Sequence, residues 1–187
     1  MGIAAIVLAA GSASRYGSPK PLEWIAGETF VGRAVRISEE AGFQPVLAVV
    51  HDDAVARAAR GGGSEAVFND RWETGLAASI AAGIDRAASD PGVEAALILG
   101  CDQVVVTADD LRRLRSAFDP EAFASAADYG NGAFGVPAIF GREAFPALSA
   151  LEGDAGAKSL LEQHRERVCF VSMPSAALDV DRPEDRR

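Results

Sequence analysis

Five short apolar runs, separated by longer segments with helical periodicity, constrain the fold of this chain more than any other feature. Most runs are continuous rather than alternating, which is typical of strands buried on both faces of a parallel sheet. They span residues 3–10, 46–50, 95–99, 136–140 and 168–171, and the helical patterns span 30–41, 74–88, 108–117, 142–151 and 155–165. Thr107, with Asp110 three residues later, predicts a capping box before the third helix. The alternation predicts an α/β fold with a three-layer, doubly wound, mostly parallel sheet.

Length and composition favour one domain. The 187 residues can form one substantial core, so we expect a single domain over residues 1–187. The net charge of −9 argues against non-specific binding to nucleic acid or to an anionic membrane. The first apolar run lacks a basic leader and is too short to span a bilayer, so we expect a cytoplasmic protein. Cys101 and Cys169 lack metal-binding spacing, which argues against a structural zinc site and a disulfide framework.

The segment that follows the first apolar run has the composition of a phosphate-binding loop. Residues 8–20 read Leu-Ala-Ala-Gly-Ser-Ala-Ser-Arg-Tyr-Gly-Ser-Pro-Lys, in which the glycines permit close backbone approach and Arg15 and Lys20 supply cations. The spacing of Gly11 and Gly17 differs from that of a Walker A loop, and residues 11–13 break the dinucleotide-binding fingerprint. The segment therefore predicts a polyphosphate site of another type.

Polar residues also follow the later apolar runs, and ligands of doubly wound sheets bind beyond the carboxyl ends of the strands. Asp102 follows the third run, where a carboxylate can bind Mg²⁺ through one oxygen while phosphates and water complete the octahedron. The alternative role for Asp102 is that of a turn or cap residue. His51, which precedes two aspartates after the second run, can belong to a metal cluster, but a surface or cap role is the interpretation that we favour.

The loop of residues 8–20 resembles the signature loop of the nucleotidyltransferases typified by molybdenum cofactor cytidylyl- and guanylyltransferases, L-A-(A/G)-G-x-S-x-R-(M/F/Y)-G-x-x-K. Residues 101–103 resemble the (C/G)-D-(Q/M)-P motif of that family, with Val104 in place of the proline. The resemblance implies a Rossmann-like nucleotidyltransferase fold and catalytic roles for Arg15, Lys20 and Asp102. The nucleotide-binding residues that it implies in these two segments are Leu8, Ala9, Ala10, Gly11, Ser12, Arg15, Lys20 and Asp102.

Further segments resemble motifs of the same family, in the same order along the chain. Residues 69–79 resemble N-x-x-W-x-x-G-(L/M)-x-x-S, and residues 135–140 and 153–158 resemble G-x-P-x-x-(F/W) and G-D-x-G-A-(R/K). The residues so implied are Asn69, Gly75 and Ser79 for the nucleotide, and Gly135, Pro137 and Asp154 for the acceptor pocket. Asp154 has an alternative role as a cap on the following helix.

The end of the chain resembles the family segment D-(I/V)-D-T-P-E-D, with Arg182 in place of the threonine. The resemblance implies that one of its first two acids is a second metal ligand. Asp181 is the favoured ligand, and Asp179 is the alternative.

The resemblance implies a Mg²⁺-dependent nucleotidyltransferase, with Mn²⁺ as the alternative cofactor. The enzyme would move a nucleoside monophosphate from an NTP to a phosphate monoester and release pyrophosphate. A phosphate monoester is mostly dianionic at neutral pH, because its second pKa is about 6, and it therefore needs no general base. Ala10 resembles the cytidylyl members, so CTP is the favoured donor and molybdopterin the favoured acceptor.

Two alternatives remain open at this point. One is a nucleotidyltransferase for a sugar phosphate or another small metabolite. The other is a non-catalytic accessory protein that binds a nucleotide or cofactor, which the departures at Val104 and Arg182 favour. The expected partners are the NTP, a phosphorylated small molecule and, transiently, a molybdoenzyme or its chaperone, with no nucleic acid and no membrane.

Overall fold

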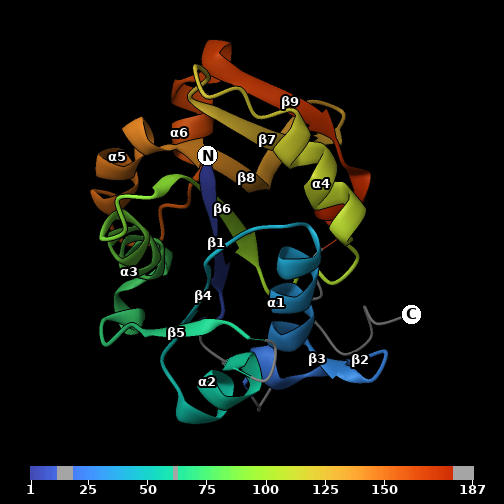
Figure 1. Cartoon of the computed structure of the whole chain (residues 1–187), viewed down its shortest axis with the longest axis vertical. Coiled ribbons are helices and arrows are strands. Elements are labelled where there is room, and N and C mark those ends of the chain that lie inside the picture. Colours follow the sequence, from blue (N-terminus) through green and yellow to red (C-terminus); the bar gives the residue numbers. More distant parts are fainter. Residues whose placement is uncertain (12–18, 61–62, 179–187) are drawn as a thin grey trace.

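Seven strands form one central sheet (Figure 1). The computed structural model describes residues 1–11, 19–60 and 63–178. In chain order the strands are β1 (Gly2–Leu8), β4 (Val46–Val50), β5 (Glu65–Phe68), β6 (Val93–Gly100), β7 (Ala124–Gly130), β8 (Ala133–Gly141) and β9 (Val168–Ser172). Their order across the sheet is β5-β4-β1-β6-β8-β7-β9. β8 is antiparallel to β6 and β7 and the other neighbours are parallel, so the mostly parallel sheet is confirmed.

Helices cover both faces of the sheet and make it the middle of three layers (Figure 1). One face carries α1 (Phe30–Glu40), α2 (Asp53–Arg60) and α4 (Ala108–Ser116), and the other carries α3 (Leu76–Ala88), α5 (Phe145–Ser149) and α6 (Lys158–Gln163). Successive residues of β1 alternate between the two cores, since Ile3, Ala5 and Val7 pack in the first and Ala4 and Ile6 in the second. Both faces are covered, which explains why the whole strand is apolar.

All five predicted strands are present. The sequence does not predict β5, β7 or α2, because each of them has only a short or weak hydrophobic pattern. β5 has four residues at the edge of the sheet, β7 consists mostly of small or polar residues, and α2 has eight residues. A hairpin of β2 (Trp24–Ile25) and β3 (Glu28–Thr29) precedes α1. Single 3₁₀ turns are η1 (Lys20–Leu22), η2 (Trp72–Thr74), η3 (Arg142–Ala144), η4 (Arg165–Arg167) and η5 (Pro174–Ala177).

The helix boundaries follow from caps and prolines. The predicted capping box is confirmed, because the Thr107 hydroxyl accepts from the Asp110 amide at 3.2 Å and the Thr107 amide donates to the Asp110 carboxylate at 3.0 Å. The predictions of helices over 142–151 and 155–165 are too long. The first is divided into η3 and α5, with Pro146 in the first turn of α5, and the second is shortened to α6.

The chain order of the strands creates a switch point between β1 and β6. From β1 the chain continues to β4 and β5 on one side, and it then crosses to β6 on the other side of β1. The Cys101 amide donates to the Leu8 carbonyl oxygen at 3.2 Å, which holds the ends of these two strands together. The next strands after β1 and after β6 lie on opposite sides of this pair, and such a switch point is where α/β proteins bind ligands.

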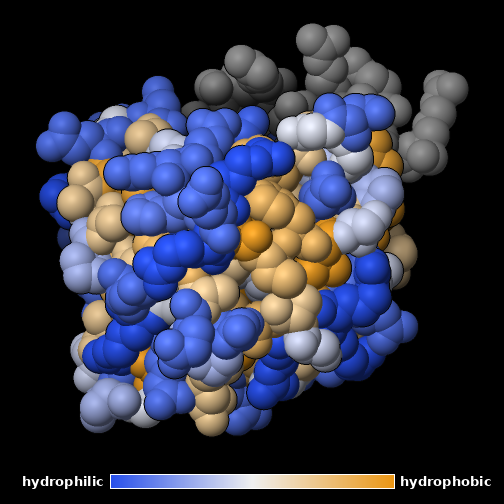
Figure 2. Space-filling view, turned by 90° about the horizontal axis from the view of Figure 1, so that it is seen from above, coloured by the Kyte–Doolittle hydropathy of each residue, from blue (hydrophilic) through white to orange (hydrophobic). Residues whose placement is uncertain are grey.

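Hydrophilic residues cover much of the surface, as the charge composition predicts. Figure 2 shows one face of the molecule, on which charged and polar residues surround a band of more apolar surface.

The Arg165 guanidinium lies 4.8 Å from the ring centroid of Phe134 and 5.2 Å from that of Phe170 on edge strand β9, so a cation covers both rings. Within the described residues, no helix has the length and apolarity needed to cross a bilayer.

Gly83 allows α3 to pack closely on the sheet, and its replacement tests this contact. A Cβ atom at this position would lie 2.4 Å from Ile6 Cγ2 and 3.1 Å from Val49 Cγ2. We predict that Gly83→Ala lowers the free energy of unfolding by about 1–3 kcal/mol through overpacking. Helix propensity alone would instead raise it by roughly 0.5–1 kcal/mol. Urea denaturation measures the sign, and a variant more stable than the wild type would contradict the packing argument.

Candidate active site

A cavity of about 700 Å³ opens at the carboxyl ends of the central strands, at the switch point. This volume is in the range of pockets that bind small molecules and cofactors. The residues that line it come from five parts of the chain and include Leu8, Ala9, Ala10, Gly11, Lys20, Pro21, Trp72, Glu73, Gly75, Leu76, Ser79, Cys101, Asp102, Gln103, Tyr129, Val136 and Asp154. The segments that carry the sequence motifs therefore meet around one space.

An ion pair joins the two loops that diverge from β1 and β6. Lys20 Nζ lies 2.7 Å from Asp102 Oδ2, and the two side chains are 20% and 31% exposed. Lys20 opens η1, directly after Pro19, and Asp102 follows the end of β6. A Cβ atom at Gly100 would lie 2.6 Å from Asp102 Oδ1, so a larger residue there would displace the carboxylate, which folds back over the strand end. The structure thus brings together two of the three predicted catalytic side chains.

The Gln103 side chain connects the loop of Asp102 to β8 and η5 by hydrogen bonds. Its side chain is buried, and its Nε2 donates to the carbonyl oxygens of Val136 at 2.8 Å and Ala176 at 3.0 Å. Val104, which stands where the resembled motif has proline, is buried against Phe30. The departure at Val104 therefore leaves Asp102 in the wall of the cavity.

The segment that was predicted to bind nucleotide contributes only part of its residues to the cavity. Gly75 and Ser79 line it, whereas Asn69 does not. The Asn69 side chain is buried, donates to the Ser79 hydroxyl at 3.1 Å and accepts from the Arg71 amide at 3.0 Å. Asn69 thus shapes the turn before α3 and holds Ser79 from behind.

Gly75 is required by its backbone conformation and by its neighbour. Its φ of 116° is unfavourable for other residues, and a Cβ atom would lie 2.2 Å from the Gly153 carbonyl oxygen. That carbonyl accepts from the Ala77 amide at 3.1 Å and so occupies one of the free donors in the first turn of α3. The contact brings Asp154 beside the start of α3.

Trp72 is a cavity residue whose role in the site the sequence analysis did not predict. Its ring stacks on His51 with centroids 4.2 Å apart and an interplanar angle of 22°. His51 therefore supports a wall of the cavity from behind. The described part of the chain holds no group of three or more potential metal ligands, so the alternative of a metal cluster at His51 receives no support there.

The predicted acceptor residues differ in their placement. Val136 lines the cavity between Gly135 and Pro137, which themselves do not. The Tyr129 hydroxyl donates to the Val136 carbonyl oxygen, and a Cβ atom at Gly135 would lie 2.6 Å from that hydroxyl. Gly135 thus makes room for Tyr129, which the sequence analysis missed because β7 was not predicted.

Asp154 lines the cavity beside Gly75 rather than next to β8. The alternative role of Asp154 as a helix cap is wrong. The N-cap position of α6 is occupied by Ala157, and no side chain caps this helix. Four predicted site residues, namely Ser12, Arg15, Asp179 and Asp181, lie outside the described residues, as does Arg182, and their roles stay predictions.

Negative charge dominates the described lining of the cavity. Lys20 is its cation, and Asp102, Glu73 and Asp154 are its carboxylates. A nucleoside triphosphate is itself strongly anionic, so these residues alone would repel it. A bound divalent cation offsets this repulsion, and the Asp102 carboxylate is the hard oxygen ligand that Mg²⁺ and Mn²⁺ prefer. The described donor set thus fits a cation that shares its coordination shell with phosphates and water.

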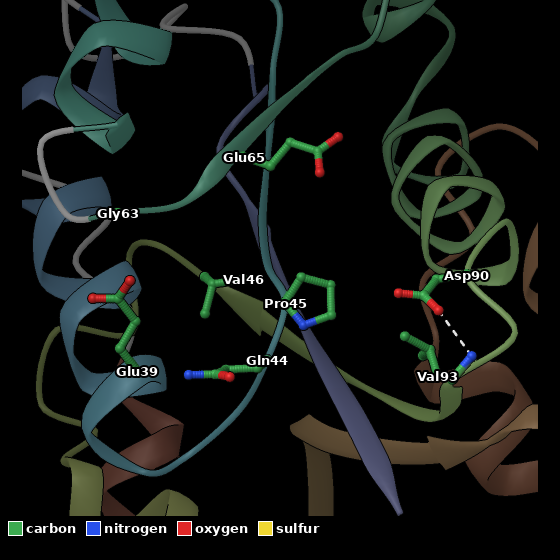
Figure 3. A pocket seen from close by; sticks show the side chains of 9 residues that line it. Glu39, Gln44, Pro45, Val46, Gly63, Glu65, Asp90 and Val93 are labelled. Atoms are coloured by element: carbon green, nitrogen blue, oxygen red, sulfur yellow. Dashed lines mark hydrogen bonds between the residues drawn. The ribbon is translucent and has the colours of Figure 1, made fainter.

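A second hollow, of about 570 Å³, lies at the opposite end of the strands (Figure 3). Glu39, Glu65 and Asp90 are among its lining residues, and it contains none of the motif residues. Glu65 already pairs with Arg86 at 2.6 and 2.7 Å. Among the described lining residues of this hollow there is no cation, which disfavours phosphate, whereas Lys20 lines the cavity at the switch point and makes it the candidate site.

Comparisons with known proteins find relatives over almost the whole chain. A family model described as MobA-like NTP transferase domain matches residues 5–168. The purine catabolism protein PucB of Bacillus subtilis is 30% identical over 192 residues, which cover 96% of this chain and 92% of PucB. The crystal structure of Rv0371c from Mycobacterium tuberculosis H37Rv has a TM-score of 0.83 at 30% identity, over 98% of this chain and 94% of that chain. A manganese complex of Rv0371C has a TM-score of 0.78 at 26% identity, over 99% and 96%.

The two cysteines provide a test of the cavity wall. Burial raises the pKa of the Cys101 thiol, and the Asp102 carboxylate raises it further, whereas Cys169 is exposed. The thiolate is the reactive form, so we predict that iodoacetamide at pH 8 modifies Cys169 and spares Cys101 in the folded protein. Mass spectrometry counts one modification, and it counts two after unfolding in urea. Equal modification rates in the folded protein would contradict the burial of Cys101.

Proposed function

The chain belongs to the MobA-like NTP transferase family, and from this premise we propose that it transfers a nucleoside monophosphate from an NTP to a phosphate monoester. The favoured donor is CTP, the favoured acceptor is molybdopterin, and the second product is pyrophosphate. The divalent cation is Mg²⁺, with Mn²⁺ as the alternative, which the manganese complex of a relative supports. The observation that carries the proposal is the Lys20–Asp102 ion pair in the wall of a cavity at the switch point.

The described residues supply positioning and charge rather than a nucleophile. The acceptor phosphate is already dianionic near neutral pH and needs no general base. Cys101 stays protonated, because burial and Asp102 both raise the pKa of its thiol. The attacking group is therefore the acceptor phosphate itself, and catalysis rests on holding it in line with the α-phosphorus of the donor.

Lys20 and Asp102 take separate roles in this reaction. Asp102, with Asp181 or Asp179 as the predicted second ligand, would hold the cation, which would supply positive charge to the phosphates. Lys20 leaves Asp102 for the phosphates of the donor and stabilises the negative charge that develops in the transition state. Arg15 has the matching predicted role at the same loop. Gly11, whose missing Cβ leaves open space, allows the phosphates to approach the backbone.

The walls of the cavity favour a flat ring on one side. Trp72, held by its stack on His51, lies with Gly75 and Ser79 in the segment that the resemblance assigns to the base and ribose. Tyr129 and Val136 line the side of β7 and β8, where the acceptor is proposed to bind. The mostly apolar surface of Tyr129 and Val136 suits the ring system of molybdopterin, but it also suits other phosphorylated metabolites.

Pyrophosphate release tests the reaction and the identity of both substrates. The protein is incubated with Mg²⁺, each of the four NTPs, and molybdopterin, a sugar phosphate or methylerythritol phosphate. We predict release with CTP and molybdopterin. Release with another pair would replace the proposed substrates, and tight NTP binding without release from any pair would support the accessory protein instead.

Thermal shift with the four NTPs measures binding separately from turnover. A ligand at 100 times its Kd raises the stability by about 2.7 kcal/mol, which corresponds to a Tm increase of about 5–10 °C for a domain of this size. We predict that CTP with Mg²⁺ gives the largest increase, and that CTP with EDTA gives little. No increase with any NTP would contradict the proposed function.

Replacement of Lys20 tests its role. We predict that Lys20→Met lowers kcat by at least about 100-fold, because a preorganised charge at the transition state is lost. The free energy of unfolding falls by about 1–3 kcal/mol, because the Asp102 carboxylate loses its cation in a partly buried place, and circular dichroism checks that the variant is folded. Arg86→Met is the matched control, because Arg86 likewise pairs with a carboxylate, that of Glu65, and lies outside the cavity lining. Near-normal turnover of Lys20→Met, or equal losses in both variants, would contradict the assignment.

A further inference from the structure

The loop after β6 carries Asp102 and has few hydrogen bonds of its own. The Gln103 amide donates to the Gly100 carbonyl oxygen at 3.3 Å, and the Val106 amide donates to the Gln103 carbonyl oxygen at 3.1 Å. On the side of β8, the Gln103 side chain holds the loop, as described above. The carbonyl groups of Val104 and Val106 lie on the side of α1, and they need a partner there.

Arg33 of α1 supplies that partner for both carbonyl groups. Its Nε donates to the Val104 oxygen at 2.8 Å and its Nη2 donates to the Val106 oxygen at 3.1 Å. The side chain is only 19% exposed, so these hydrogen bonds are partly shielded from water. A guanidinium group presents its donors in a rigid planar fork, and it can therefore hold two carbonyl groups in a defined relative position.

Glu28 holds the guanidinium of Arg33 in place. Its Oε1 lies 3.4 Å from Arg33 Nη1, and its carboxylate also accepts two hydrogen bonds from Arg36 at 2.6 and 2.9 Å. The hydrogen bonds with Arg36 lower the pKa of Glu28, and Arg33 lowers it further, so the carboxylate stays charged near neutral pH. Phe30, one turn before Arg33, is fully buried and packs against Val104. Polar and apolar contacts from α1 thus converge on the same loop.

We infer that Arg33 is a positioning residue for Asp102: by holding the Val104 and Val106 carbonyl groups, it keeps the Asp102 carboxylate in the cavity wall, ready to bind the divalent cation. This inference rests on the proposed function. Arg33 does not line the cavity, so it acts through the loop and not on the substrates. Groups that hydrogen-bond directly to a metal ligand typically contribute 10–100-fold to metal affinity or activity, and Arg33, which acts through the backbone of the loop, is expected at the lower end of this range.

Arg33→Met and Arg33→Lys test the inference, with Arg36→Met as the matched control. Arg36 binds the same Glu28, but none of its described hydrogen bonds reaches the loop. Binding of Mn²⁺ in the presence of CTP is measured by electron paramagnetic resonance, and kcat is measured against the Mg²⁺ concentration. We expect Arg33→Met to weaken Mn²⁺ binding about 10-fold or more and to raise the Mg²⁺ concentration at half-maximal rate. We expect Arg33→Lys to lie between the two, and Arg36→Met to resemble the wild type.

Hydrogen exchange of the peptide that covers residues 101–107 reports on the loop without any ligand. We expect faster exchange in Arg33→Met than in Arg36→Met. A proline at position 104 reduces the backbone freedom of the loop, and within the described residues the Val104 amide donates no hydrogen bond that would be lost. We therefore expect Val104→Pro to restore part of the Mn²⁺ affinity when it is combined with Arg33→Met.

The outcomes separate this inference from the proposed function. If the wild type binds Mn²⁺ with CTP and Arg33→Met binds it equally well, the positioning role is wrong and the proposed function stands. Equal losses in Arg33→Met and Arg36→Met would mean general destabilisation and would also overturn the role. If the wild type itself binds neither Mn²⁺ nor CTP, the proposed function fails, and the role of Arg33 toward a metal fails with it. Should Arg33→Met not fold, Arg33→Lys decides by the same criteria.

Discussion

The parallel pairing of β1 with β4 on one side and β6 on the other is the constraint on which the rest of the structure depends. β1 is buried between two layers of helices, so its register with both neighbours is set by two apolar cores at once. The bond from the Cys101 amide to the Leu8 carbonyl oxygen continues this pairing to the strand ends. Lys20 and Asp102 meet at 2.7 Å because their loops start from this shared edge.

The charged side chains that line the cavity determine which ligands it favours. The protein has a net charge of −9, and the described lining residues add carboxylates around Lys20. Such a lining opposes a triphosphate that arrives without a cation, and it favours one that arrives with a divalent metal. The Lys20–Asp102 pair keeps each of the two groups compensated before substrates bind, so neither charge is left alone in a partly buried place. Long-range contacts of Arg33 and Gln103 hold the acidic partner in position.

The sequence predicts the course of the backbone around the cavity better than it predicts the contacts of the side chains there. Gly75 and Ser79 line the cavity, and a sequence motif can indicate this because both lie on one turn and the helix that follows it. Asn69, Gly135 and Pro137 belong to similar motifs but do not line it. Asn69 holds Ser79 and Gly135 makes room for Tyr129, and both roles depend on contacts between segments that are apart in the sequence. Residue type at a given spacing does not distinguish a group that contacts the ligand from one that supports such a group.

The sequence by itself determined the layered α/β fold and the edge at which the cavity opens, because continuous apolar strands can be buried only between two helical layers and their carboxyl ends share one edge. It also placed Lys20 and Asp102 at that edge. The tertiary structure alone decided which side chains pair there. The ion pair joins residues 82 positions apart, and Arg33 reaches the loop of Asp102 across 71 positions. Such contacts arise from the packing of whole elements, for which no local pattern in the sequence provides a signal.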